Sequence, residues 1–221
     1  MQYIVKIKEI LQVTHDVKCF RVERPEGFAF SPGQATDLSV NRAGMEEETR
    51  PFTFTALATK PYLEFTIKRY PEHHGVTDLL HHLQPGDELI IREPWGAISY
   101  QGPGYFIAGG AGITPFIAIF RSLYEEHKIT GNRLIFSNKT VGDIIYRDEL
   151  LKMLGTDAKF ILTKEQKNGY ESGRIDEQFL KTSVSDFNSH FYVCGPDPMV
   201  NEIVNTLQKL GASVDSLVFE K

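Results

Sequence analysis

Three short stretches of the chain combine residue types that could bind an anion or a flat ligand. The first, GGAGITP (109–115), follows an apolar strand-like run and precedes a helix-like one. Its glycines allow a tight turn and a close approach of the backbone to a ligand. The free N–H groups of a helix N-terminus would suit a diphosphate, and Pro115 fits a first helical turn. An ordinary strand-to-helix turn explains the stretch equally well, since Pro115 replaces the third glycine of the dinucleotide fingerprint.

The second stretch, RPFTFT (50–55), places an arginine and a proline before aromatic residues that alternate with threonines. A guanidinium pairs with phosphate through parallel hydrogen bonds, and an aromatic ring can stack on a flat ligand. Taken alone, however, the stretch is better explained as an ordinary strand with mixed faces.

The third stretch, CGPDPM (194–199), ends another apolar run. Gly195 and Pro196 indicate a turn, and Asp197 suits the N-cap of the helix that follows. Cys194 would lie at the same sheet edge as the glycine loop, although a lone cysteine is more often a buried structural residue.

The elements that must position these stretches change in character near residue 100. Before it, short runs of alternating polarity are separated by turn residues, which predicts an antiparallel barrel. After it, apolar strands alternate with helical spacing, which predicts a parallel sheet covered on both faces. The expected strands of the first half are 3–10, 18–24, 35–40, 50–57, 63–70 and 88–94. Those of the second half are 105–110, 133–138, 159–163, 190–195 and 213–220.

Composition limits the kinds of protein this chain could be. Its 221 residues suit one large or two small domains, and its net charge of −5 gives no footprint for nucleic-acid binding. Cys19 and Cys194 are too few for an iron–sulfur cluster and suit a reducing compartment. The start of the chain carries charges within its apolar run, unlike a signal peptide, and residues 105–120 are too few to span a bilayer. We therefore expect a cytoplasmic protein without a membrane span or a nucleic-acid partner.

Together and in this order, the three motifs resemble the ferredoxin–NADP reductase superfamily. The resemblance covers nearly the whole chain. It implies an N-terminal antiparallel Greek-key β-barrel over residues 1–100 that binds FAD. It also implies a C-terminal Rossmann-like parallel sheet over residues 101–221 that binds NADH or NADPH.

The resemblance also implies roles for the residues of the barrel. Arg50 would pair with the FAD diphosphate, Phe52 would stack on the isoalloxazine ring, and Thr53 would place its hydroxyl near flavin N5, with Pro51 between them. Many members have tyrosine in place of Phe52, so stacking is retained and one hydroxyl hydrogen bond is lost.

A second diphosphate contact is implied for Gly75, Val76 and Thr77, although Thr77 could instead be a helix N-cap. Lys68 and Arg69 would lie at the flavin edge or be solvated.

In the second domain the resemblance places the nucleotide diphosphate over Gly110–Thr114, including Gly112. Thr114 and Cys194, with Gly195 and Pro196 after it, would lie near the nicotinamide. The implied reaction is hydride transfer from nicotinamide to flavin N5. Electrons would then pass to a separate acceptor, such as ferredoxin, flavodoxin, an oxygenase or a small molecule. Thr53 and Cys194 are the residues assigned to catalysis. Glu220 aligns with an acid that some relatives keep near the flavin, but a solvated glutamate is the better explanation.

Coenzyme choice rests on a few charged residues. Asp143 lies where NADH-using relatives carry an acid, and a carboxylate would repel a 2′-phosphate and accept hydrogen bonds from a ribose diol. Lys139, Lys164 and Arg174 could each face a phosphate, so the balance favours NADH only slightly.

Two other functions remain open, namely a free-flavin reductase and a non-catalytic electron-transfer subunit or nucleotide sensor. The pairs His73–His74 and His81–His82 lack the further ligands of a recognisable metal site, so no metal site is predicted.

Overall fold

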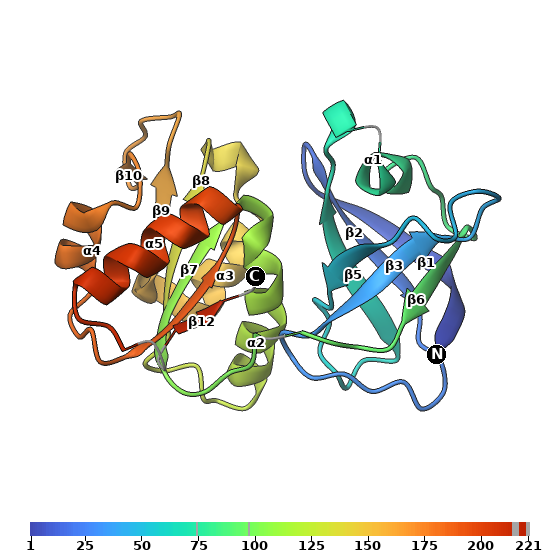
Figure 1. Cartoon of the computed structure of the whole chain (residues 1–221), viewed down its shortest axis with the longest axis horizontal. Helices are drawn as coiled ribbons and strands as arrows, with labels where there is room; N and C mark the ends of the chain where they lie inside the picture. Colours follow the sequence, from blue (N-terminus) through green and yellow to red (C-terminus); the bar gives the residue numbers. More distant parts are fainter. Residues whose placement is uncertain (74, 97, 214–216, 220–221) are drawn as a thin grey trace.

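The computed structural model describes the chain except for residues 74, 97, 214–216 and 220–221. His74 and Glu220, both considered above, therefore lie outside the described residues. The two halves of the chain lie side by side, with the antiparallel strands on one side and the α/β layers on the other (Figure 1). The predicted order of an antiparallel barrel followed by a parallel sheet is confirmed.

The barrel is a six-stranded antiparallel sheet with the strand order β4-β3-β6-β1-β2-β5. A bridge between Phe54 and Phe65 joins its two ends, so the sheet closes on itself. Phe54 is fully buried and its ring centroid lies 5.2 Å from that of Phe65. Closure removes the exposed strand edges and surrounds an aromatic core. The strands are β1 (Gln2–Thr14), β2 (Val17–Glu23), β3 (Ala35–Val40), β4 (Arg50–Thr53), β5 (Tyr62–Lys68) and β6 (Glu88–Arg92).

Two short helical segments follow β5. These are the 3₁₀ turn η1 (Pro71–His73) and the helix α1 (Val76–Leu80). Gly75, not Thr77, is the N-cap of α1, so the alternative role of Thr77 as an N-cap is wrong. Val76 is buried against the barrel core, which fixes the turn that precedes Thr77.

The second half contains six parallel strands in the order β10-β9-β8-β7-β11-β12. Successive residues of β7 face opposite sides: Phe106 and Ala108 pack in the core beneath α2 and α3, whereas Tyr105 and Ile107 pack beneath α4 and α5. The strands are β7 (Gly104–Gly109), β8 (Arg133–Asn138), β9 (Ala158–Leu162), β10 (Glu171–Ser172), β11 (His190–Cys194) and β12 (Leu217–Phe219).

The helices of this half cover both faces of the sheet (Figure 1). Asp197 begins α5, whose N-cap is Pro196, so the expectation that Asp197 caps this helix is wrong by one position. In the described part of the chain, no helix has the length and apolar character needed to cross a membrane. The helices are α2 (Thr114–Glu125), α3 (Arg147–Leu154), α4 (Glu177–Ser183) and α5 (Asp197–Lys209), with 3₁₀ turns η2 (Gly110–Ile113), η3 (Val141–Asp143) and η4 (Gly155–Asp157).

Two kinds of contact join the halves. Val17 of β2 is buried in the same cluster as Phe116 and Ile117 of α2. The second contact is polar: Glu64 of β5 is 2% exposed and accepts a 2.7 Å hydrogen bond from Arg121 of α2. Arg121 also binds Glu149 of α3 through two hydrogen bonds. This buried polar contact between the halves was not predicted from the sequence.

The strand order of the parallel sheet also marks where a ligand would bind. The chain leaves β7 for β8 on one side and returns on the other side to β11, so the direction of strand succession reverses between β7 and β11. In such sheets, ligands bind beyond the carboxyl ends of the strands at this reversal. Gly109 and Cys194 are the last residues of these two strands.

Candidate active site

A cleft of about 840 Å³ lies between the barrel and the parallel sheet. Twelve of the fifteen residues proposed from the sequence line it; Arg50, Gly75 and Val76 are the exceptions. The twelve are Pro51, Phe52, Thr53, Lys68, Thr77, Gly110, Gly112, Thr114, Asp143, Cys194, Gly195 and Pro196. The strand ends named above therefore bring the three sequence motifs to one place.

The barrel side of the cleft is largely apolar. Pro51, Phe52 and Thr53 come from β4, which pairs antiparallel with β3 and is held at the edge of the barrel. Phe52 is half-buried and packs partly against the barrel core, so its ring has a fixed support. Arg50, at the start of β4, is exposed and donates a hydrogen bond to the carbonyl of Thr49, 2.6 Å away.

The opposite side of the cleft is built from two turns that touch. A Cβ on Gly112 would lie 2.3 Å from the carbonyl oxygen of Cys194, and a Cβ on Gly109 would lie 2.4 Å from Sδ of Met199. Only glycine allows the loop after β7 to pack this closely on the turn after β11. Gly110 has a φ of +52°, and no atom lies within 4 Å of the place that a Cβ would occupy there, so its backbone faces open space. This arrangement leaves open space beside the glycine loop, where a diphosphate could meet backbone N–H groups.

One hydrogen bond crosses the cleft between the two halves. The hydroxyl oxygens of Thr53 and Thr114 are 2.8 Å apart, and the Thr114 hydroxyl also lies 3.0 Å from the carbonyl of Ala111. If Thr114 donates its single hydroxyl proton to Ala111, Thr53 is the donor to Thr114. Cys194 is half-buried and lines the same cleft. The two residues assigned to catalysis thus share one cavity.

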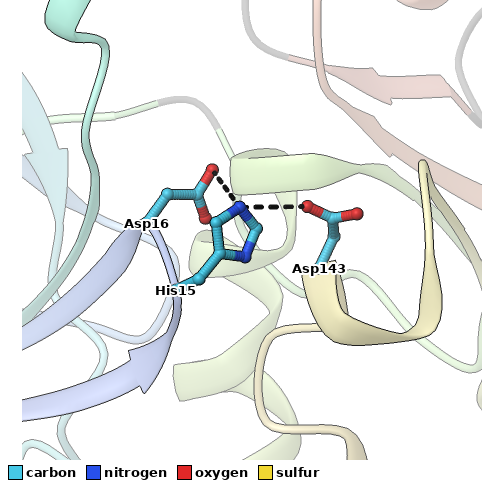
Figure 2. A group of neighbouring side chains, drawn as sticks. All are labelled: His15, Asp16 and Asp143. Carbon is cyan, nitrogen blue, oxygen red and sulfur yellow. Dashed lines mark ion pairs between the residues drawn. The ribbon is translucent and has the colours of Figure 1, made fainter.

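A chain of charged groups lies at the edge of the cleft, where the β1–β2 turn meets η3 (Figure 2). Lys68 pairs with Asp16 at 2.9 Å, and the Lys68 side chain is 15% exposed, so it is not simply solvated. Burial would raise the pKa of Asp16, but hydrogen bonds from Lys68 and Thr14, with the charge of Lys68, hold it below its usual value. Nε2 of His15 lies 3.7 Å from Asp16 and 3.8 Å from Asp143.

Asp143 has a second, local role. Its Oδ2 accepts hydrogen bonds from the backbone N–H and the hydroxyl of Thr140, at 2.8 and 2.6 Å, and so caps η3. Oδ1 faces His15 of the barrel. Of the basic residues considered for coenzyme choice, Lys139 lines the cleft, whereas the exposed Lys164 and Arg174 do not.

Several histidines and carboxylates have partners other than a metal. The ring nitrogens of His81 and His82 lie 2.9 and 2.8 Å from the carbonyls of Ile67 and Asp78. Burial lowers the pKa of His81, which favours its neutral form. Among the described residues, His15, Asp16 and Asp143 form the group whose atoms lie close enough for a shared cation, but Lys68 already pairs with Asp16.

Sequence reasoning missed part of the cleft lining. Trp95 and Tyr70 place partly exposed aromatic rings at its barrel side, and Ser137 and Asn138 lie at the end of β8. Asn138 could have been found, because an asparagine directly after the apolar run RLIFS lies at the carboxyl edge of a predicted parallel strand. Trp95 offered no such signal, because it lies in the connection between the halves.

The residues present fit a flavin on the barrel side and a dinucleotide on the other. An aromatic ring with a hydroxyl beside it faces the cleft from β4, and a glycine loop with open backbone faces it from β7. Phe52 and Thr53 would hold the ring system, and Gly110, Gly112 and Thr114 would hold the nucleotide.

Comparison with known proteins agrees with this division. Residues 4–100 match the oxidoreductase FAD-binding domain family, and residues 106–205 match the oxidoreductase NAD-binding domain family. FAD is therefore the cofactor of the barrel, and a nicotinamide nucleotide is the cofactor of the parallel-sheet half.

Individual relatives are named as reductases. The reductase component of propane 2-monooxygenase from Rhodococcus jostii is 27% identical, over 98% of this chain and 62% of its own length. NADH-cytochrome b5 reductase 2 from Mycosarcoma maydis is 30% identical, over 89% of this chain and 62% of its own length. The chain thus spans about three fifths of these curated relatives.

The fold has a solved counterpart in the FAD/NAD-binding domain of a nitric oxide dioxygenase from Vibrio cholerae. The TM-score is 0.87 at 20% identity, covering 98% of this chain and 97% of that one. The two domain families in sequence order, the reductase relatives and the shared fold show that the chain belongs to the ferredoxin–NADP reductase superfamily.

Proposed function

We propose that this protein is an FAD-dependent NAD(P)H reductase that supplies electrons to a separate acceptor. The observation that carries the proposal is the 2.8 Å contact between the hydroxyls of Thr53 and Thr114. Thr53 belongs to the strand proposed for the flavin, and Thr114 follows the loop proposed for the nucleotide. The contact between them supports a cleft in which the two proposed cofactor sites converge.

The bound flavin would accept a hydride from the nicotinamide and release the electrons to the acceptor. The chain's own residues orient the reactants and exclude water. Phe52 supports the flavin ring by stacking, Arg50 and the turn at Gly75–Thr77 pair with the FAD diphosphate, and Thr53 hydrogen-bonds the reacting edge. Cys194 and Thr114 hold the nicotinamide against that edge, which lowers the entropic part of the barrier.

The acceptor is proposed to be a protein such as an oxygenase component, a ferredoxin or a flavodoxin. Relatives named as reductase components of monooxygenases support this choice. The chain has two cysteines, Cys19 and Cys194, and so few suit a reducing compartment such as the cytoplasm.

Flavin retention tests this proposal against a free-flavin reductase, in which flavin is a substrate. The purified protein is passed through a desalting column and the flavin released by heat is identified. We expect FAD, in a stoichiometry near one per chain, and an Arg50→Ala variant that retains less of it. Protein that loses all flavin yet reduces added FMN and FAD equally would support the free-flavin reductase instead.

We further propose that NADH is the preferred donor, because the Asp143 carboxylate at the cleft would repel a 2′-phosphate. Asp143→Ser should improve the kcat/KM for NADPH relative to that for NADH. Because Asp143 also caps η3, Asp143→Asn is the matched control: it removes the charge and keeps an acceptor for Thr140. A coenzyme ratio unchanged in both variants would remove the basis for this preference.

A further inference from the structure

Asn138, at the end of β8, has a side chain without hydrogen-bond partners. It is 5% exposed and lines the cleft, and neither Oδ1 nor Nδ2 has a partner among the described residues. Its backbone is fixed, because its carbonyl accepts a 2.9 Å hydrogen bond from the N–H of Thr163. Buried polar side chains are normally paired, so a ligand in the cleft could supply the hydrogen-bond partners that this amide lacks.

Two other buried side chains also have an unpaired atom, but neither resembles Asn138. Asn132 leaves only Oδ1 unpaired, since its Nδ2 donates to Ile129 and Tyr100. His190 leaves only Nδ1. Neither residue lines the cleft. Within the described part of the chain, Asn138 is thus the side chain that combines a fully unpaired amide with a place in the cleft.

The position of Asn138 in the sheet indicates which part of a nucleotide it would meet. Ser137 is in register with Gly109, so Asn138 lies one residue further along, level with Gly110 at the start of the glycine loop. In doubly wound folds, an Asp or Glu that follows the glycine loop in sequence hydrogen-bonds the ribose 2′-hydroxyl, while the loop holds the diphosphate.

The hydrogen-bonding groups of the Asn138 amide match those of a ribose hydroxyl. A neutral asparagine offers two donors on Nδ2 and an acceptor on Oδ1. A hydroxyl both donates and accepts and can satisfy the two atoms together, whereas phosphate oxygens at neutral pH mainly accept. We propose that Asn138 binds the adenosine ribose of the nicotinamide nucleotide through its hydroxyls. This inference rests on the proposed function.

The assignment also changes the part played by Asp143. Oδ2 of Asp143 is held by Thr140, and Oδ1 faces His15. Asn138 has no such competing partners and becomes the direct ribose contact, while Asp143 contributes its charge at the edge of the cleft. In NADPH the ribose 2′-hydroxyl is replaced by a phosphate. The hydroxyl can donate a hydrogen bond to Oδ1 of Asn138 but the phosphate cannot, so NADPH binding is disfavoured.

Equilibrium binding to an Asn138→Leu variant tests the inference. Leucine has a similar volume but cannot hydrogen-bond, so the dissociation constants of both NAD⁺ and ADP should rise by about tenfold, as expected when about two neutral hydrogen bonds are lost. ADP is included because it contains the adenosine ribose and a diphosphate but no nicotinamide. Binding is measured by calorimetry, and the FAD content should be unchanged.

The melting temperature provides a second measurement. It would fall in Asn138→Leu if the amide had only a structural role. Replacing an unpaired buried amide by leucine should leave the melting temperature of the nucleotide-free protein unchanged or raise it. The matched control is Asn132→Leu, which breaks the bonds to Ile129 and Tyr100. It should lower the melting temperature and leave nucleotide affinity unchanged.

Each outcome separates the inference from the proposed function. If Asn138→Leu binds NAD⁺ and ADP as tightly as the unmodified protein does, or weakens NAD⁺ but not ADP, the ribose assignment is wrong while the reductase function stands. A fall in melting temperature like that of Asn132→Leu would also overturn it, because the amide would then have a structural role. If the unmodified protein binds neither NAD⁺ nor NADP⁺, the proposed function itself fails.

Discussion

At the scale of single residues, the site depends on a few hydroxyl and ring groups rather than on an acid–base pair. Thr53 is held by the barrel and Thr114 by the parallel sheet, yet their hydroxyl oxygens are 2.8 Å apart. A ligand that enters between them must replace this hydrogen bond with its own. The Thr53 hydroxyl is therefore expected to hydrogen-bond the bound ligand and to help orient it.

Removal of the Thr53 hydroxyl should slow flavin reduction without causing loss of the bound flavin. Thr53→Val keeps the shape of the side chain, and we expect about a tenfold lower rate of flavin reduction by NADH, or about 1.4 kcal/mol of transition-state free energy. Stopped-flow absorbance measures this rate in single turnovers. The control Thr53→Ser retains the hydroxyl and should stay close to the unmodified rate. Equal rates in all three proteins would show that the hydroxyl has no role in the reaction.

At the scale of elements, the nucleotide side of the site depends on the contact between the loop after β7 and the turn after β11. Gly112 lies so close to Cys194 that a Cβ would be 2.3 Å from the cysteine carbonyl oxygen. The contact fixes the position of this loop, which lines the cleft. Gly142 of η3 offers a comparison, because the nearest atom to a Cβ there is the Thr140 hydroxyl oxygen at 3.7 Å.

Gly112→Ala should therefore weaken nucleotide binding and stability together. We expect a loss of about 1–3 kcal/mol in the free energy of unfolding, typical of an overpacked site, and a raised KM for NADH. The matched variant Gly142→Ala should change neither quantity. Urea denaturation and steady-state kinetics measure both. A Gly112→Ala protein with unchanged KM would mean that the loop position does not control nucleotide binding.

The sequence predicted the elements better than their boundaries or partners. The runs ATDLSV and RLIFSN are strands with the expected limits, because turn residues flank each apolar pattern. The N-caps are Gly75 and Pro196 rather than Thr77 and Asp197, which the sequence offered for this role. Neither Gly75 nor Pro196 makes a side-chain capping hydrogen bond, so no side-chain chemistry marks these positions in the sequence.

Residues that line the cleft were predictable where a local motif marks them, as at RPFTFT and GGAGITP. Asn138 was missed although its strand was predicted, because a single polar residue at a strand end is common. Glu64 and Arg121 were missed because they are 57 residues apart and belong to different halves of the chain. No local pattern reports a contact of that kind.

At the scale of the whole molecule, the cleft exists because the two halves are held together. Glu64 of the barrel and Arg121 of α2 form the buried centre of that contact. Burial would raise the pKa of Glu64, but the charge and hydrogen bonds of Arg121, with hydrogen bonds from Arg21 and Thr55, lower it below the usual value. The carboxylate is thus ionised in the folded protein, and the ion pair connects the halves behind the cleft.

Because the folded-state pKa of Glu64 is lowered, the carboxylate stabilises the protein above the unfolded-state pKa of about 4.3, and this contribution is lost as the pH falls below that value. We expect Glu64→Gln to lose about 2 kcal/mol at pH 7, with a difference that shrinks below about pH 4. Denaturation at a series of pH values measures this. Glu202→Gln, at an exposed position of α5, is the control and should behave like the unmodified protein. A difference that persists undiminished at low pH would contradict the assigned pKa direction.

The most direct test of the proposed reaction is the absorption spectrum of the desalted protein during anaerobic addition of NADH and, separately, NADPH. We predict a retained flavin band that NADH bleaches within the first turnover and that NADPH bleaches more slowly. A flavin band that neither nucleotide changes would contradict the account, because the two cofactor sites would then not meet at Thr53 and Thr114.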